Sequence, residues 1–281
     1  MSDLHSINEA INKKAGRKLL PSIVVGLSLI ALVWFTLSYQ REIFAIVVAV
    51  AVILGVRELV RAFSARGIVI SFNGLTLAAI GLSYAAWVGG VAGLAVATAI
   101  AFPLLLIRAL LQGPEGFVAK ATATTFGLLY LPFLAGFLIL LARPSTGFQR
   151  VMTFVVLVGC NDTFGYIVGV LLGKHPLVPK ISPKKTWEGL AGSLIFTMIG
   201  GALAFEYIMD MHWWIGIIVG LMIVFTATCG DLIESAMKRD LSLKDMGTLL
   251  PGHGGMLDRL DSVVLSSPAM WLALELVKHF L

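Results

Sequence analysis

The feature that most constrains this chain is a series of long apolar runs separated by short polar segments. Nine runs come near the roughly 20 residues that a helix needs to cross a bilayer. They cover 20–38, 43–60, 70–87, 89–107, 122–141, 151–173, 188–209, 213–233 and 262–279. Because every backbone amide inside lipid must be hydrogen-bonded within the protein, runs of this length are helices. The sequence therefore predicts an all-α fold, a polytopic integral membrane helical bundle of about nine transmembrane helices.

The composition agrees with a lipid environment. Charged residues make up 13% of the 281 residues, against roughly a quarter in soluble domains, which is too few for a water-exposed surface. The net charge of +5 is too small to indicate nucleic-acid binding, and the basic residues lie mostly between apolar runs. That placement favours lipid headgroups or phosphate ligands. Cys160 and Cys229 lie in apolar stretches without CxxC spacing, so neither a disulfide nor a thiolate metal site is implied.

The basic residues also indicate an orientation, because cytoplasmic loops of membrane proteins are enriched in Lys and Arg. With the N-terminus in the cytoplasm, 17 of the 21 Lys and Arg residues fall on the cytoplasmic side. The other side keeps Arg41, Arg143, Arg150 and Lys278. We therefore expect a multi-pass protein of the cell (inner) membrane with a cytoplasmic N-terminus and an external C-terminus.

The chain divides into three parts on this interpretation. A cytoplasmic tail, 1–19, precedes N-terminal transmembrane helices in 20–150, and a C-terminal catalytic region follows in 151–281. The last part holds two predicted cytoplasmic loops, 174–187 and 234–261, the longest polar stretches after the tail. Both loops are crowded with residues that a simple connector does not need.

Asp162 lies in the middle of the sixth apolar run, in Cys-Asn-Asp-Thr-Phe-Gly-Tyr, 160–166. A carboxylate inside a membrane segment costs several kcal/mol unless it faces a partner or a wet cavity. Tyr166, four residues on, shares its helix face, and Asn161 is adjacent. This pattern indicates a functional residue, with a polar contact between helices as the alternative.

The segment 173–189 has a composition that suits phosphate binding. Lysine ammonium groups, hydroxyls and backbone amides can surround an anion, and the candidates here are Lys174, Ser182, Lys184, Lys185 and Thr186. The alternative is a positive-inside loop in which Thr186 or Ser182 caps the next helix, with Glu188 or Gly189 in its first turn.

The third group of polar residues begins at the end of the eighth run. Asp231, then Glu234 or Ser235, and then Lys238 fall on one stripe of a helix. Downstream, the glycines of Pro-Gly-His-Gly-Gly, 251–255, precede an expected helix start, whose outward amides favour phosphate. Asp258 and Asp261 share one face of that helix. Carboxylates on two helices, with basic residues around them, are what Mg²⁺ and a nucleoside triphosphate require.

At this point the residues match a known family. The stretch SAMKRDLSLKDMGTLLPGHGGMLDRLD, Ser235 to Asp261, resembles the signature of the phosphatidate cytidylyltransferases, also called CDP-diacylglycerol synthases. That signature has a serine, a Lys-Arg pair, a Lys-Asp pair and His-Gly-Gly followed by Asp-Arg-x-Asp. The segment from Asp162 to Gly189 is similar to a second region of the family, although Phe164 departs from the small residues usual before the tyrosine. The N-terminal half agrees only in being several apolar helices.

The resemblance implies that CTP and phosphatidic acid give CDP-diacylglycerol and pyrophosphate, with Mg²⁺ required and K⁺ as an assisting cation. It assigns Asp231 and Asp258 as principal metal ligands, with Asp261 and Asp162 nearby. Contacts to the triphosphate or pyrophosphate fall to Lys238, Arg239, Lys244 and Arg259. The phosphatidate phosphate falls to Ser182, Lys184, Lys185 and Thr186. Further substrate-site candidates are Lys174, Ser235, Gly254, Gly255 and His253, where His253 either donates a hydrogen bond to phosphate or orders the glycine turn.

Other functions remain to be weighed against this one. A transporter of an anionic substrate would also place charges among helices, but it predicts inverted repeats and broken helices near the midplane, and no repeat is evident. A CDP-alcohol phosphotransferase would carry a different aspartate motif, which is absent. A cytidylyltransferase for another lipid phosphate stays open. The family further suggests a homodimer, with membrane lipids, CTP and phosphatidic acid as the partners.

Overall fold

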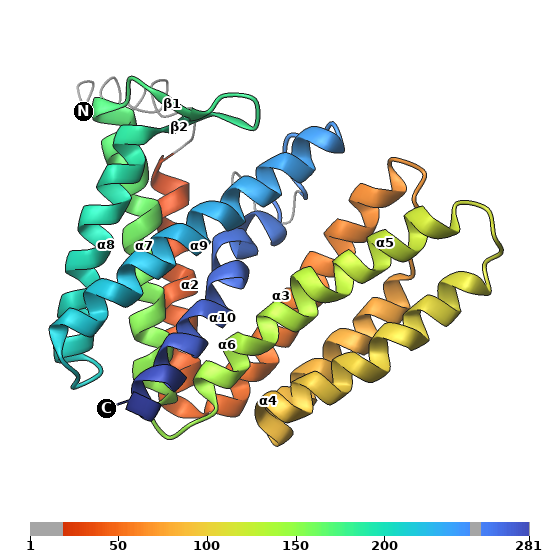
Figure 1. Ribbon diagram of the computed structural model, residues 1–281, viewed down its shortest axis with the longest axis horizontal. Coiled ribbons are helices and arrows are strands. Elements are labelled where there is room, and N and C mark those ends of the chain that lie inside the picture. The colour runs from red at the N-terminus through yellow and green to blue at the C-terminus, as the bar shows by residue number, and fades with distance from the viewer. Residues whose placement is uncertain (1–18, 248–253, 281) are drawn as a thin grey trace.

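The computed structural model describes residues 19–247 and 254–280, which form an all-α bundle of helices that alternate in direction (Figure 1). The predicted fold class, an all-α polytopic membrane protein, is confirmed. The helices are α2 (Leu19–Tyr39), α3 (Arg41–Ser64), α4 (Phe72–Leu110), α5 (Phe117–Leu128), the π-helix η1 (Leu129–Phe133), α6 (Leu134–Ala142), α7 (Gly147–Leu172), α8 (Trp187–Tyr207), α9 (Trp213–Asp240) and α10 (Leu257–Phe280). Two short strands, β1 (Pro176–Val178) and β2 (Ser182–Thr186), form an antiparallel hairpin between α7 and α8.

The expected count of nine spans is not matched, although it is close. Within the described residues, seven helices are long and apolar enough to cross a membrane, and Val24–Tyr39 of α2 is a shorter apolar helix. The predicted runs 70–87 and 89–107 both fall in α4, which is continuous in secondary structure but not straight.

The helix α4 folds back on itself at Gly90. Gly90 has a left-handed backbone (φ 63°, ψ −148°), which glycine adopts without the steric cost that a side chain brings. Its two arms then run side by side, so that the Arg108 Nε atom near the end donates to the Ser71 Oγ atom at the start, at 2.6 Å. Arg143 closes the fold by donating to the carbonyl oxygens of Trp87 and Val88. The two runs are therefore two antiparallel arms of one element.

The elements α5, η1 and α6 together make a single span, Phe117–Ala142. Pro132 lies within it, and a proline cannot donate the backbone hydrogen bond of a regular helix. The chain forms a π-helical turn at this point, which is a rare feature that often marks functional sites. The turn carries Tyr130, whose side chain is buried.

The C-terminal helices pack closely because small residues let their backbones approach. The helix α8 packs against both α7 and α9, and α10 packs along α9. At Gly230 of α9, an added Cβ would lie 2.4 Å from the Asp261 carbonyl oxygen of α10. This close crossing brings the polar residues of the two helices together.

The hairpin β1–β2 and the C-terminal end of α9 lie at one end of the bundle, at the top of Figure 1, and the α4–α5 connection lies at the right of the same view. The described C-terminus lies at the opposite end. The described parts of the two loops that the sequence singled out, 174–187 and 234–261, therefore meet, as the Arg239 contact with the Ile181 carbonyl shows. That loop 174–187 contains a β-hairpin is a finding that the sequence patterns did not predict.

Candidate active site

Three helices bring carboxylates together inside the bundle. The Asp231 side chain on α9 lies within hydrogen-bonding distance of Asp261 on α10. Asp162 on α7 is held by the Asn161 Nδ2 atom at 2.9 Å and by the Ser262 Oγ atom at 3.3 Å. Asp162 is exposed although it lies in mid-helix, whereas Asp261 is buried. The expected intramembrane carboxylate thus belongs to a cluster and is not an isolated contact between two helices.

One lysine of the hairpin, Lys185, neutralises part of this negative charge. Lys185, at the end of β2, places its Nζ atom 2.5 Å from the Asp231 Oδ2 atom. The pair is partly exposed, with 26% of the Lys185 side chain and 36% of the Asp231 side chain accessible. The contact ties the first predicted loop directly to the acidic cluster.

A second charged group lies nearer the loop end of the bundle. Lys238 is seven residues beyond Asp231 along α9, about 10 Å at 1.5 Å per residue. Its Nζ atom contacts the Glu234 Oε2 atom at 2.6 Å and the Asp258 Oδ1 atom at 2.9 Å. The stripe of Asp231, Glu234 and Lys238 is therefore real, and it faces the carboxylates of α10.

Asp258 also organises backbone around it. Its Oδ2 atom accepts from the Gly255 amide at 2.7 Å and the Met246 amide at 3.1 Å. Both carboxylate oxygens of Asp258 therefore have protein partners. As a metal ligand, Asp258 would have to exchange one of these contacts.

The amides at the start of α10 were expected to face a phosphate, and the structure differs here. The Met256 and Leu257 amides donate to the two carboxylate oxygens of Glu58, at 2.9 and 2.8 Å. Glu58 belongs to α3 in the N-terminal half and is buried. A protein carboxylate thus occupies the position that the sequence assigned to a ligand anion.

An open groove of about 500 Å³ lies over this second group of charges. Its lining combines residues of the β-hairpin, the end of α9 and the segment that follows α9. Five of the predicted site residues line it: Ser182, Ser235, Lys238, Arg239 and Lys244. The groove falls within the volume range of small-molecule sites, and its charged lining residues are all basic.

This grouping differs from the expected one in one respect. Ser182 was expected with the lipid phosphate, yet it lines the same groove as Lys238 and Arg239. The Arg239 Nε atom donates to the Ile181 carbonyl at 3.3 Å, which holds the hairpin turn against α9. The hairpin therefore contributes to the groove through Ser182 and to the acidic cluster through Lys185.

The remaining predicted residues have other surroundings. The Thr186 Oγ1 atom accepts from the Gly189 amide at 3.1 Å and so caps α8, as the alternative for this loop predicted. Lys184 and the side chain of Lys174 are exposed on the loop, and the Lys174 amide donates to Glu188 at 3.1 Å. Gly254 has φ +77°, a conformation that disfavours any side chain.

Arg259 follows Asp258 on α10 and does not line the groove. The prediction on His253 lies outside the described residues.

Sequence reasoning missed two residues of the N-terminal half. Glu58 looks like one more acid near a helix end, beside Arg57 and Arg61, and no local pattern indicates its partners. Tyr130 lies within electrostatic range of Asp261, Glu234 and Asp231, and its buried hydroxyl has no hydrogen-bond partner within the described residues. Pro132, inside an apolar run, was the available signal of a distorted helix at this point.

The donor chemistry of the cluster fits a hard cation such as Mg²⁺. Among the described residues, no group of three or more His, Cys, Asp or Glu side chains is arranged as a protein cage for a metal ion. Mg²⁺ usually binds through one or two carboxylates plus water and substrate phosphates, so it does not need such a cage. Asp231 and Asp261 supply a carboxylate pair, and the buried Glu234 Oε1 and Asn161 Oδ1 atoms are oxygens with no hydrogen-bond partner.

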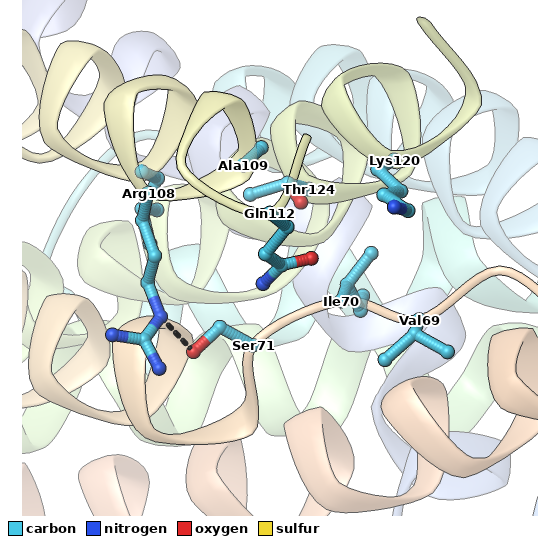
Figure 2. Close-up of a pocket in the computed structure, with 9 residues that line it drawn as sticks. Val69, Ile70, Ser71, Arg108, Ala109, Gln112, Lys120 and Thr124 are labelled. Atoms are coloured by element: carbon cyan, nitrogen blue, oxygen red, sulfur yellow. Dashed lines mark hydrogen bonds between the residues drawn. The ribbon is translucent and has the colours of Figure 1, made fainter. Parts of the chain in front are cut away.

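A second depression lies apart from these residues, between α4, α5 and the segment before α4 (Figure 2). Arg108, Gln112 and Lys120 surround it, and Arg108 is bonded to Ser71 across it. Its volume of about 10 Å³ admits no more than a water molecule. The depression therefore has no room for a phosphate group.

Comparison with known proteins identifies the family to which this site belongs. A model of the cytidylyltransferase family matches residues 21–277, which is most of the chain. This chain belongs to the cytidylyltransferase family. The match includes the N-terminal helices, so the family resemblance extends beyond the two motifs.

Individual relatives agree with the family model. This cytidylyltransferase is 38% identical over 280 residues to a phosphatidate cytidylyltransferase of Mycobacterium leprae, covering 94% of this chain and 90% of the relative. It is 36% identical over 277 residues to the protein of the same name from Mycobacterium bovis, with the same coverage. A Staphylococcus aureus phosphatidate cytidylyltransferase matches over 137 residues at 40% identity, 48% of this chain and 52% of the relative.

Proposed function

We propose that this cytidylyltransferase transfers the cytidylyl group of CTP to phosphatidate, giving CDP-diacylglycerol and pyrophosphate. The observation that carries the proposal is the meeting of a basic groove with a carboxylate cluster at one end of a membrane bundle. The groove is of nucleotide size and is lined by Lys238, Arg239 and Lys244. The cluster of Asp162, Asp231 and Asp261 lies deeper, toward the membrane-spanning part of the helices. The mycobacterial relatives of similar length carry the name of this activity.

The reaction depends on positioning of the substrates and on charge neutralisation more than on proton transfer. A phosphatidate phosphate oxygen attacks the α-phosphorus of CTP, the new P–O bond forms, and the bond to pyrophosphate breaks. The attacking oxygen is already anionic, so no strong general base is needed. Holding two polyanions in line supplies much of the rate acceleration, and fixed positive groups stabilise the charge that develops on the leaving group.

The residues divide between these tasks. Arg239 and Lys244 are exposed in the groove, where their charges are available to the triphosphate and the departing pyrophosphate. Lys185, which contacts Asp231, lies between groove and cluster and can orient the lipid phosphate. Asp231 and Asp261 would hold Mg²⁺, with Asp258 reaching it only by exchanging a present contact. Mg²⁺ would supply charge neutralisation on the phosphates. An assisting role for K⁺ stays a prediction.

We also propose the orientation and access routes of the site. The loop end, with most of the Lys and Arg residues, lies on the cytoplasmic side of a bacterial-type cell membrane, so CTP enters the groove from water. Asp162 is exposed in mid-helix, which suits a lateral opening through which the lipid phosphate enters from the inner leaflet. A homodimer stays a prediction, which light scattering of the detergent complex would test.

A substrate panel tests the activity. The purified protein in mixed micelles is given CTP and Mg²⁺ with phosphatidate, a polyprenyl phosphate or an ether-linked phosphatidate analogue, and pyrophosphate release is measured. We expect rapid release with phosphatidate and none without lipid phosphate. Preferential use of polyprenyl phosphate would show that the lipid substrate is not phosphatidate. No pyrophosphate release with any acceptor would refute the proposal.

A further inference from the structure

The buried carboxylate of Glu58 connects the N-terminal half to the catalytic segment. Its two oxygens accept from the Met256 and Leu257 amides, which are 198 and 199 residues away in the chain. No Lys or Arg among the described residues forms an ion pair with it. Its negative charge is stabilised by the first amides of α10, which have no hydrogen-bond partner within the helix. It is also stabilised by the positive end of the helix dipole.

Two glycines close around the same carboxylate. A Cβ added at Gly247 would lie 2.3 Å from the Glu58 Oε1 atom, and one added at Gly255 would lie 2.3 Å from the Oε2 atom. Both distances are too short for any real side chain, so glycine is required at each position while Glu58 keeps its place. The end of the segment after α9 and the residues before α10 thus converge on one side chain.

The contacts continue from this point into the groove. The Gly255 amide, next to the Glu58 carboxylate, donates to the Asp258 Oδ2 atom at 2.7 Å. The Met246 amide, next to Gly247, donates to the same oxygen at 3.1 Å. Asp258 in turn holds the Lys238 Nζ atom at 2.9 Å, and Lys238 lines the groove. A displacement at Glu58 would therefore move the backbone that fixes Asp258 and, through it, Lys238.

We propose that Glu58 is a positioning residue for the nucleotide side of the site, acting through the backbone around Asp258. The inference rests on the proposed function, because it takes the groove as the CTP site. It predicts that loss of Glu58 weakens the use of CTP while leaving the use of phosphatidate nearly unchanged. Among the described residues, Asp162 is bound by Asn161 and Ser262, and Lys185 is bound by Asp231, all outside the backbone around Asp258. A cap that only stabilised α10 would affect the two substrates equally.

The test compares Glu58→Ala, Glu58→Gln and Glu58→Asp with Glu42→Gln, a control in the first turn of the same helix whose side chain is exposed. Steady-state rates are measured with CTP and the surface fraction of phosphatidate varied separately. Two hydrogen bonds to a charged group are lost in Glu58→Ala, so we expect kcat/KM for CTP to fall at least about tenfold. Glu58→Gln keeps one acceptor and should fall between Glu58→Ala and the control.

Hydrogen exchange supplies a readout that does not depend on turnover. Amides of 254–260 should exchange faster in Glu58→Ala than in the control, while those of α7 and α8 should not change. This readout separates the inference from the proposed function, because it applies even if the wild type fails to use CTP and phosphatidate.

A double-mutant cycle provides the specific geometric test. Gly255→Ala should impair the wild type strongly because its Cβ meets the Glu58 carboxylate, and it should cost much less in the Glu58→Ala background, where that space is empty. Unchanged kinetics for CTP with unchanged exchange in Glu58→Ala would overturn the proposal. An equal loss for both substrates, with faster exchange throughout the bundle, would reduce Glu58 to a stabilising cap and overturn it as well.

Discussion

Replacement of Asp231 by asparagine separates catalysis from folding most cleanly. The change removes one anionic oxygen ligand and the charge partner of Lys185 while keeping the side-chain shape. We expect turnover to fall on the order of a hundredfold or more, as for loss of a catalytic metal ligand. A hundredfold loss corresponds to about 2.7 kcal/mol of transition-state stabilisation.

The effect of the same change on stability should be much smaller. Both partners of the Lys185–Asp231 pair are partly exposed, with 26% and 36% of their side chains accessible. Pairs at that exposure contribute about 0–1 kcal/mol, and the lost attraction is offset by reduced repulsion with Asp261. The free energy of unfolding should therefore change by less than about 1 kcal/mol.

Pyrophosphate release at saturating CTP and phosphatidate, over a series of Mg²⁺ concentrations, measures the first quantity, and thermal unfolding in detergent measures the second. Asp240→Asn is the matched control, because Asp240 ends the same helix with an exposed side chain. Near-normal turnover of Asp231→Asn at limiting Mg²⁺ would remove Asp231 from the site. A large fall in the unfolding temperature would show that the pair is structural and refute the reasoning from exposure.

Three further predictions concern substrate routes, the N-terminal half and topology. Lys184→Ala should raise the apparent KM for phosphatidate more than that for CTP, and Lys244→Ala should do the reverse, each by about tenfold or less for one charge-assisted contact. Steady-state kinetics in mixed micelles measure both constants. If both variants change only the KM for CTP, both lysines belong to the nucleotide half. Tyr130→Phe should leave the unfolding temperature unchanged or raise it, because the variant deletes a buried hydroxyl that has no partner within the described residues. The same variant should lower kcat. An unchanged kcat would show that the hydroxyl takes no part in the reaction. Cysteines placed at residues 184 and 244 should be shielded from an impermeant thiol reagent in intact cells while one at residue 145 reacts, and labelling at residue 244 from outside would reverse the orientation.

Much of the fold follows from local sequence features. Apolar runs of membrane-spanning length place the helix ends to within seven residues, and the Gly89–Gly90 pair lies where α4 turns back. The Thr186 cap and the Glu234–Lys238 pair depend on residues three or four apart. Such short-range interactions are visible in a sequence because helix geometry alone determines which side chains meet.

The parts of the site that escaped prediction depend on distant partners. Nothing within ten residues of Glu58 indicates that its oxygens meet the amides of α10, and nothing in loop 174–187 indicates which lysine reaches Asp231. The sequence identified the glycine turn before α10 as a phosphate-binding feature, because free helix amides bind anions. Only the packing of α3 against this turn reveals that a carboxylate of the protein already holds those amides.

The Glu58 contact also has a consequence for how the molecule is made. Glu58 is synthesised with α3, whereas the amides that bind it, at the start of α10, follow 198 and 199 residues later in the chain. Throughout synthesis of the intervening helices, the nascent chain carries an acid whose compensating amides do not yet exist. The start of α10 therefore joins the two halves late in synthesis, and a chain interrupted before α10 leaves the Glu58 carboxylate without these two amides.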